Sequence, residues 1–549
     1  MNTEENAVTT PALTIAQRMG HAAITTTTGM VAINVEDPNI SAVAQAICQN
    51  MPCTFIYRRG ENYLTVRQSI HQKNGLYFIQ EREMTSRRLC SYLGDHLIFR
   101  KGSGDKAKRV SLSKELAEKV LASDVFFDHT PELEMVVPVR LPVWEQSEGA
   151  RRIIIPAAGF DPVTGNYIAE TLNYTAAAPS LTPAQLVAFW NNLMASFPWG
   201  SESKKEEDQV WRHRSGSVMG PCPSTNRSAC CCLALMLGQY CRLLIDDVMP
   251  MGIFNANQPG SGKTLLAMLC ISPVWGMGAA TATPKNEEEM IKGIHTALLA
   301  KKGYFLMDDI PVLNNNTINM VATANEIEGR VLGGLSGFST KNRMQIFATG
   351  NGIGTSPDVE RRALIIDLFL SGNALERKFT TTLDQKTINA PSMRADMLRF
   401  MHAMVQNWNT AGCPILVDKN AKPSFSSFAT IVGSIMLHNG FASPFTPRKY
   451  SGAGGDLIGR TVKKLLAKFV TIKLATTRTG NFKIAEIVEF ADAHDLTQTI
   501  TGGKSPSHSM GKRLEPLRGQ ILQDENARPF EFGKREEAGH SSYTFTRLD

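Results

Sequence analysis

The segment MGIFNANQPGSGKTLLAMLC, residues 251–270, decides the fold. An apolar run leads into a loop ending Gly-Ser-Gly-Lys-Thr and a helix-forming run leaves it, which predicts a loop between a strand and a helix N-terminus. In the pattern GxxxxGK[ST], backbone amides surround phosphates, the Lys reaches the β and γ groups, and the hydroxyl holds Mg²⁺. Gly262, Lys263 and Thr264 match this pattern, so we predict a site for ATP and Mg²⁺.

Asn257 stands where the pattern has its first glycine. Asn adopts a positive φ more readily than most other residues, so the loop can still turn, and Gly260 adds freedom. A chance glycine-rich loop is the alternative. The sequence predicts nucleotide contacts from Asn257, Gly260, Ser261, Gly262, Lys263, Thr264 and Leu265.

A second signal is KKGYFLMDDI, residues 301–310. Tyr304 to Met307 read as a buried strand that ends in Asp308 and Asp309. A carboxylate at the C-terminal end of such a strand supports Mg²⁺, and its neighbour orients the attacking water. We assign these roles to Asp308 and Asp309, respectively. Most ATPases of this kind carry Asp-Glu here, so the shorter Asp309 is a departure.

A third signal is RMQIFATGNGIGTSPDVERRALIIDL, residues 343–368. Its strand runs to Asn351, a neutral polar side chain suited to positioning water or sensing a γ-phosphate. Arg361 and Arg362 follow before another apolar strand. An Arg supplied by a neighbouring subunit stabilises a transferring phosphoryl group. We favour Arg361 for this role over Arg362.

These three motifs together resemble the AAA+ ATPase core, particularly the helicase ATPases of prophages and mobile elements, which are related to MCM-type and superfamily 3 helicases. The resemblance covers about residues 155–445. It implies a hexameric ring that moves single-stranded DNA through its central pore by ATP hydrolysis. The first 180 residues carry no convincing primase motif, so a primase that acts with the chain is expected to be a separate protein.

Composition limits the class of protein. The chain has 549 residues, of which 43% are apolar, with a formal net charge of +7. No apolar run reaches the ~20 residues that cross a bilayer, and the N-terminus is unlike a signal peptide. We therefore expect a cytoplasmic protein without membrane contact. The ten cysteines lack the paired spacing of zinc ligands and read as reduced, buried side chains.

The fold class predicted is multidomain α/β. We expect an N-terminal α+β region, a central P-loop AAA+ core with a parallel sheet and a helical lid, and a C-terminal winged helix. The predicted boundaries are a loose N-terminus at 1–25, the α+β domain at 26–180, a helical segment at 181–249, the ATPase core at 250–375, the lid at 376–447 and the winged helix at 448–549.

Two regions are candidates for contact with nucleic acid. Lys341 and Arg343 follow a glycine-rich stretch on an expected hairpin, where related helicases place a pore hairpin; an ordinary solvated turn is the alternative. Residues 448–549 hold 17 Lys and Arg against 12 Asp and Glu. Their third predicted helix, within HSMGKRLEPLRGQIL, exposes Lys512, Arg513 and Arg518 to duplex DNA. A small basic helical lid is the alternative there.

The leading hypothesis is an ATP-dependent, ring-forming DNA helicase of a mobile element or prophage that acts in DNA replication. The alternative is a DNA-binding AAA+ initiator or helicase loader that uses ATP as an assembly switch and unwinds nothing. A non-enzymatic scaffold locked by nucleotide is disfavoured because the sensor and arginine positions are filled.

Overall fold

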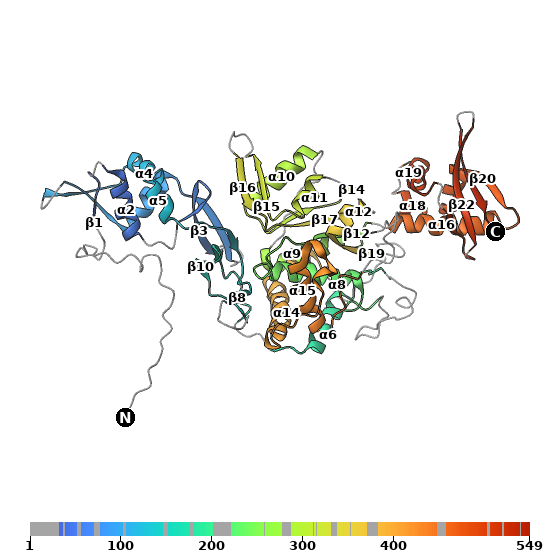
Figure 1. The fold of residues 1–549 in the computed structure, drawn as a ribbon, viewed down its shortest axis with the longest axis horizontal. Coiled ribbons are helices and arrows are strands. Elements are labelled where there is room, and N and C mark those ends of the chain that lie inside the picture. Colours follow the sequence, from blue (N-terminus) through green and yellow to red (C-terminus); the bar gives the residue numbers. More distant parts are fainter. Residues whose placement is uncertain are drawn as a thin grey trace, which may run out of the picture. The chain divides into compact units, whose positions relative to one another are not determined.

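The computed structural model describes residues 32–548, with gaps at 37–38, 52–55, 71–76, 103–105, 146–151, 176–179, 201–220, 257–258, 277–286, 311, 314–315, 331–336, 352, 370–382, 447–456, 502–504, 519–520, 527 and 538–539. Two compact units divide the chain (Figure 1). The first comprises Met1–Arg140 and Pro156–Asn173, and the second comprises Leu141–Ile155 and Tyr174–Asp549. Residues 141–155, which the sequence analysis placed in the N-terminal domain, thus belong to the second unit.

The first unit is an α+β structure. Its described strands form three sheets in the orders β1-β5-β6, β2-β3-β4 and β10-β11-β7. Helices α2, α3, α4 and α5 contribute buried side chains to one apolar core with β1 and β5. The strands are β1 (Ala32–Asn34), β2 (Tyr57–Arg59), β3 (Asn62–Ile70), β4 (Tyr77–Glu83), β5 (Ile98–Lys101), β6 (Lys108–Val110), β7 (Met135–Val137), β10 (Gly159–Asp161) and β11 (Asn166–Ile168), and the helices are α2 (Ile40–Asn50), α3 (Ser86–His96), α4 (Lys114–Leu121) and α5 (Asp124–His129).

The second unit contains a sheet whose described strands run in the order β13-β17-β12-β19. These strands are β12 (Met251–Ala256), β13 (Tyr304–Met307), β17 (Gln345–Asn351) and β19 (Ala363–Leu368), and all three pairings are parallel. Parallel strands in a sheet covered on both faces are apolar along their whole length. Every residue of β12 and β19 is buried, as this rule requires.

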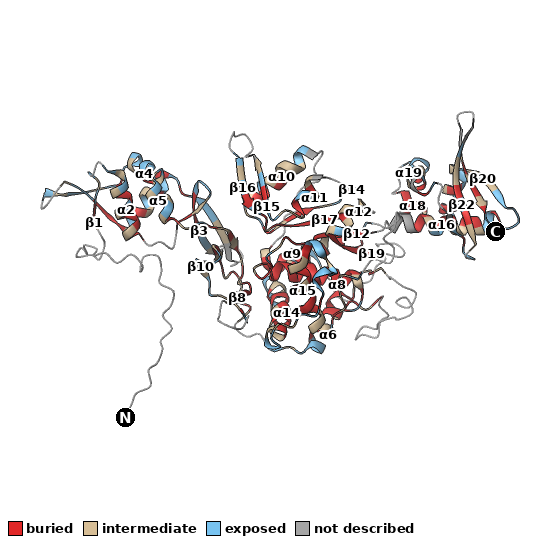
Figure 2. Ribbon diagram, viewed as in Figure 1, coloured by how far each residue is buried: buried red, intermediate tan, exposed pale blue. Residues whose placement is uncertain are grey.

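Helices pack around this sheet, and Figure 2 colours several of them largely as buried. Helix α6 (Pro183–Met194) begins with a capping box formed by Thr182 and Gln185. Helix α8 (Arg227–Tyr240) is buried on all sides, and α9 (Lys263–Trp275) follows the glycine-rich loop. The others are α10 (Glu287–Leu299), α11 (Asn316–Val321), α12 (Pro357–Arg362), α13 (Gln385–Asn389), α14 (Pro391–Thr410), α15 (Ser426–His438) and the 3₁₀ turns η3 (Lys419–Ala421) and η4 (Pro423–Phe425).

Short strand pairs complete the second unit before its C-terminal region. Strands β8 (Val143–Glu145) and β9 (Arg152–Ile154) form a hairpin, and Ile153 exchanges two hydrogen bonds with the side chain of Asn409. The other pairs are β14 (Val312–Leu313) with β18 (Gly354–Thr355), and β15 (Glu326–Arg330) with β16 (Gly337–Lys341). None of the helices among the described residues combines the length and apolarity that crossing a bilayer requires.

The C-terminal region has its own core, formed by helices and one antiparallel sheet. The sheet runs in the order β20-β23-β22-β21, and β22 and β23 form a long hairpin. The elements are α16 (Leu457–Lys473), β20 (Thr479–Lys483), α17 (Ile484–Asp492), α18 (Thr497–Thr501), α19 (Pro506–Leu514), η5 (Glu515–Leu517), β21 (Ile521–Gln523), β22 (Pro529–Glu537) and β23 (His540–Arg547).

The third predicted helix of this region is shorter than expected. Helix α19 ends at Leu514, and Arg518 lies beyond η5, so the prediction that Arg518 lies on the helix is wrong. Pro516 explains the difference, because proline has no N–H and its ring clashes with the preceding turn of a helix. Lys512 is exposed, Arg513 is half-buried, and Arg518 forms an ion pair with Glu515 at 3.6 Å.

Candidate functional site

The glycine-rich loop after β12 turns sharply into α9. Gly260 and Gly262 have φ values of 78° and 94°, a left-handed conformation that favours glycine. Gly262 is the residue that precedes α9, and no side chain caps the helix there. A Cβ atom at Gly262 would lie 3.0 Å from the ring of Phe197. The loop therefore presents backbone at the start of α9, where amides and the helix dipole favour an anion.

Asp308 connects this loop to the sheet. Its Oδ1 accepts a hydrogen bond of 2.8 Å from the hydroxyl of Thr264, on the first turn of α9. The same oxygen accepts a short hydrogen bond from the hydroxyl of Thr349, which is buried on β17. A carboxylate and a hydroxyl side by side supply the oxygen ligands that Mg²⁺ prefers. The structure thus brings Asp308 and Thr264, the two residues predicted to hold the cation, into contact.

Asp309 lies beside Asp308 in an unusual backbone conformation, with a φ of 53°. Its amide donates to Thr349 Oγ1 at 3.1 Å, and the amide of Ile310 donates to the Thr349 carbonyl at 2.8 Å. Asp and Asn adopt positive φ more readily than other side chains do, and Glu is not among the favoured residues. This conformation gives a physical reason for Asp at a position where Glu is common.

The Asp309 side chain points to two of the predicted site residues. Its Oδ1 lies 3.8 Å from Lys263 Nζ and 3.5 Å from Asn351 Nδ2. The Asp309 side chain is 72% exposed, whereas the Lys263 side chain is only 11% exposed. An ammonium, a carboxylate and an amide therefore converge at one place, with contacts long enough to be exchanged for those of a ligand.

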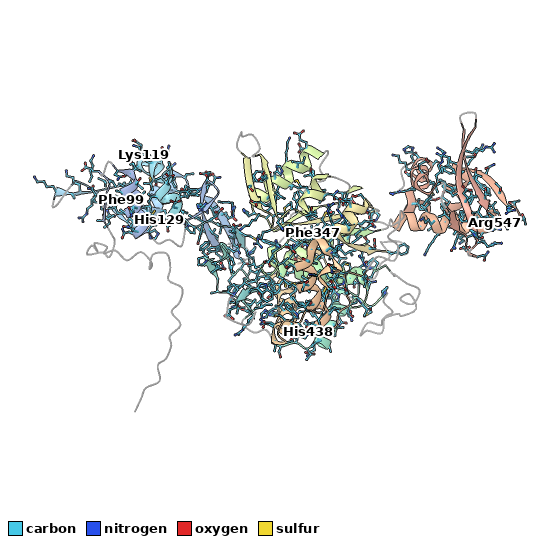
Figure 3. The ribbon with its side chains drawn as sticks, in the orientation of Figure 1. Phe99, Lys119, His129, Phe347, His438 and Arg547 are labelled. Atoms are coloured by element: carbon cyan, nitrogen blue, oxygen red, sulfur yellow. The ribbon has the colours of Figure 1, made fainter. Side chains whose placement is uncertain are left out.

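Strand order explains why these residues meet. Because all strands of the sheet are parallel, their C-terminal ends lie at one edge, where ligands bind in open α/β sheets. Strand β17 lies between β12 and β13, so Asn351 ends its strand between the glycine-rich loop and Asp308. Residue Ala256 pairs with Asn351, and Met307 pairs with Ala348. Phe347, labelled in Figure 3, is fully buried and fixes β17 in the core.

Thr349 is a site residue that the sequence analysis did not single out. It bonds both to the Asp308 carboxylate and to the Asp309 amide, so it fixes the two adjacent carboxylates. The signal that points to it is a hydroxyl in an apolar strand, two residues before Asn351. Gly350 is also required, because a Cβ atom there would lie 2.2 Å from the carbonyl oxygen of Ile310.

The remaining predicted site residues lie in the glycine-rich loop, on α9 and on α12, and they differ in how far they are exposed. Asn257 lies outside the described residues, Ser261 is buried in the loop, and Leu265 is half-buried on α9. Arg361 and Arg362, on α12, both pair with Asp358, the former at 2.7 Å. The Arg361 side chain is 63% exposed and that of Arg362 is 14% exposed. Arg361 is therefore the more accessible of the two to another chain.

Lys341 and Arg343 lie at the base of a hairpin. Lys341 ends β16 and stands opposite Glu326 of β15, and the turn at the other end of the hairpin falls in residues 331–336, outside the described part. Arg343 precedes Gln345, the first residue of β17. Both cations thus lie toward the amino-terminal edge of the parallel sheet, away from Asn351.

Asp247, the second of two consecutive Asp residues before β12, has a structural role. Asp247 Oδ2 accepts hydrogen bonds from the amide of Ser427 at 3.0 Å and from the hydroxyl of Ser426 at 3.3 Å. These bonds satisfy the start of α15, as a carboxylate at a helix N-terminus does. The contacts of Asp247 therefore account for it as a capping residue of α15. Among the described residues, no cluster of three His, Cys, Asp or Glu is arranged to hold a metal ion.

Comparison with known proteins adds little to this geometry. No family model matches the chain, and no curated protein does either. The A-form apo structure of the C-terminal region of NrS-1 is similar with a TM-score of 0.33 and 10% identity, over 88% of this chain and 96% of that one. A second A-form apo structure of that region has a TM-score of 0.29 and 11% identity, with the same coverage. TM-scores this low carry no argument, so function is inferred from the residues above.

Proposed function

We propose that residues 250–375 form an AAA+ core that binds and hydrolyses ATP with Mg²⁺, and that the chain is a ring-forming DNA helicase of a mobile element or prophage. The observation that carries the proposal is the convergence of Lys263, Thr264, Asp308, Asp309 and Asn351 at the C-terminal edge of the parallel sheet. These residues are up to 88 positions apart in the sequence. Together they supply the ammonium, hydroxyl, carboxylate and amide groups that catalyse phosphoryl transfer to water.

Each side chain has a role that follows from its contacts. Bound Mg²⁺·ATP supplies the γ-phosphoryl group that is transferred. The buried ammonium of Lys263 balances phosphate charge, and Thr264 with Asp308 holds the cation. The exposed carboxylate of Asp309 accepts a hydrogen bond from the attacking water, and Asn351, whose amide lies 3.5 Å from that carboxylate, senses the γ-phosphate. Thr349 keeps Asp308 and Asp309 at a fixed spacing.

The exposed position of Arg361 supports assembly into a ring, which we take to be a hexamer. Its ion pair with Asp358 is at the surface, and such pairs contribute only about 0–1 kcal/mol. A neighbouring subunit with a triphosphate bound is therefore able to attract Arg361 from Asp358 at small cost. Arg362 is packed against the protein and is the weaker candidate. In this arrangement hydrolysis depends on assembly.

DNA contact is proposed at two places. Single-stranded DNA passes through the ring, where Lys341 and Arg343 bind phosphates. The C-terminal region, with helices α16, α17 and α19 and the β22–β23 hairpin, is proposed as a winged helix that binds duplex DNA. Support comes from Lys512, exposed in the last turn of α19, and from a hollow of about 320 Å³ that Lys512 lines together with Lys534 of β22.

A second candidate function is an AAA+ initiator or helicase loader that uses ATP as an assembly switch. The observation that favours it is Asp309 in place of the more common Glu, a carboxylate one methylene shorter on a backbone held at a φ of 53°. A shorter carboxylate reaches less far toward the attacking water, which gives slow turnover. The two candidates share the nucleotide site and differ in whether turnover moves DNA.

The experiment that separates them measures steady-state ATP hydrolysis with and without single-stranded DNA, together with unwinding of a forked duplex. The helicase predicts hydrolysis stimulated severalfold by single strands and unwinding that requires ATP. Hydrolysis that is indifferent to DNA, with no unwinding, would instead select the switch. A protein that hydrolyses no ATP under either condition would reject both.

A further inference from the structure

A β-hairpin at one side of the three-stranded β1-β5-β6 sheet of the first unit, here called the ribbon, carries a dense group of cations. It is formed by β5 and β6, and residues 98–110 contain five Lys and Arg and one Asp. Arg100, Lys101, Lys108 and Arg109 lie on the two strands, and all four are exposed. Figure 2 shows exposed residues at the far end of the ribbon beside β1. Nothing in the proposed ATPase or in the C-terminal region uses these residues.

The register of the ribbon places like charges opposite each other. Arg100 pairs with Arg109, and Lys101 pairs with Lys108. Like charges directly opposite on antiparallel strands destabilise the pairing, because their Cβ atoms are about 4.5–5.5 Å apart. The described residues offer one ion pair to these four cations, from Lys101 to Glu36 at 3.6 Å, and both of its side chains are largely exposed. The ribbon therefore retains repulsion that an anion would relieve.

The ribbon is held rigidly at its base. Phe99, labelled in Figure 3, and Leu112 are buried in the core that α2, α3, α4 and α5 share with β1. The amide of Val35 donates to the carbonyl of Arg100 at 3.0 Å, which joins β1 to the ribbon near its charged end. Because the base is packed in the core, the backbone holds the four cations at fixed positions. When an anion binds, the main cost is the conformational entropy that their flexible side chains lose.

Both faces of the ribbon are charged. Side chains alternate across a strand, so Arg100 and Arg109 lie on one face while Lys101 and Lys108 lie on the other. A flat anionic surface meets one face only. Strand β1 pairs with β5 as far as Arg100, and beyond it, at Lys101 and Lys108, the described pairing is that of β5 with β6. The major groove of B-DNA is about 12 Å wide, admits a two-stranded ribbon and has phosphates along both walls. The distribution of charge on the ribbon thus fits a groove better than a surface.

We propose that the β5–β6 ribbon is a duplex DNA contact that binds backbone phosphates through Arg100, Lys101, Lys108 and Arg109. The contact is independent of sequence, because it is made to phosphates. It is also independent of ATP, because every residue that forms it lies in the first unit. If the ribbon does not bind DNA, the proposed ATPase is unaffected. If the chain does not hydrolyse ATP, the proposed DNA contact of the ribbon is likewise unaffected.

The test compares two variants of the full chain that lose the same charge. Arg100→Gln/Arg109→Gln removes one facing pair, and Lys114→Gln/Lys119→Gln removes two exposed cations of α4 that are ion-paired to Glu118 and Glu115. Binding of a short labelled duplex of random sequence is measured without nucleotide at several salt concentrations. Each lost phosphate contact lowers the slope of log K against log salt by about 0.9.

The ribbon variant is expected to reduce that slope by about 1.8, since two contacts are lost, while the α4 variant stays near the parent protein. The melting temperature of the ribbon variant should not fall, because repulsion is removed. Equal slopes for both variants would overturn the proposal. Two further probes are measured with the ribbon variant, a single-stranded DNA and polyglutamate. Weaker binding of single-stranded DNA alone would also overturn the proposal. So would weaker binding of polyglutamate with an unchanged slope for duplex DNA, which would indicate an acidic protein partner.

Discussion

The two edges of the parallel sheet in the second unit differ in how their polar groups are satisfied. At the C-terminal edge, Asp309 is exposed, and its contacts to Lys263 and Asn351 measure 3.8 and 3.5 Å. At the amino-terminal edge, Gln345 is fully buried and bonds to Gln239 and to the carbonyl of Pro250. Gln239 in turn accepts a hydrogen bond from the indole of Trp275.

This difference distinguishes the proposed nucleotide site from a polar network that only stabilises the core. A buried and satisfied polar network fixes a core, and removing one member leaves its partners without hydrogen bonds. Partly exposed charges whose mutual contacts are long are stabilised more by a bound ligand than by one another. Changes at the C-terminal edge should therefore alter turnover, and changes at the amino-terminal edge should alter stability.

Among the residues at the ends of β13 and β17, the largest effect is expected at Asp308. Asp308→Asn keeps the shape but removes the charge that supports Mg²⁺, so kcat for ATP should fall by at least about 100-fold, the scale of losing one preorganised transition-state contact. Because Lys263 and the loop remain, nucleotide binding measured without Mg²⁺ should stay close to that of the parent. Near-normal turnover in the Asp308→Asn variant would contradict the assignment of the cation site.

A smaller effect is expected at Thr349. Thr349→Val removes the hydroxyl that holds Asp308 and the Asp309 amide, so kcat should fall about tenfold, as for a misplaced reacting group. Thr349→Ser keeps the hydroxyl and serves as the control, with turnover near that of the parent. A Val variant as active as the Ser variant would show that Thr349 positions nothing.

At the amino-terminal edge the effect should shift from turnover to stability. Gln345→Leu has a similar volume but leaves Gln239 and the Pro250 carbonyl without their partner, which should cost about 1–3 kcal/mol in the free energy of unfolding. Turnover per folded molecule should remain within about twofold, since no site residue is touched. Denaturant unfolding and active-site titration measure the two quantities. A large loss of kcat in soluble, folded protein would contradict the separation of the two edges.

Local elements of this sheet were predictable from the sequence. The strand Tyr304–Met307 has the predicted bounds, since a short apolar run before two Asp residues has one plausible reading. In the same unit, Thr182 followed by Pro183 marks the start of α6, because Thr caps helices and Pro is favoured at their first position. Such features depend only on neighbours in the sequence.

Features that depend on distant contacts were not predictable. The sequence does not state that β17 lies between β12 and β13, and this order is what brings Asn351 to Asp309. Likewise, residues 141–155 join the second unit, where Ile153 bonds to Asn409, 256 positions away. Thr349 was not predictable as a site residue because Thr is common in strands for its β-branched shape alone. Its role follows only from its hydrogen-bond partners, which lie at the end of another strand.

The most direct measurement is ATP turnover by Lys263→Ala beside a matched lysine variant, Lys302→Ala, whose side chain is exposed before β13. Both variants lose one ammonium, but only Lys263 is buried at the C-terminal edge beside Asp309. We predict that Lys263→Ala abolishes hydrolysis while Lys302→Ala retains the rate of the parent protein. Turnover that survives in folded Lys263→Ala would show that this edge of the sheet is not the nucleotide site.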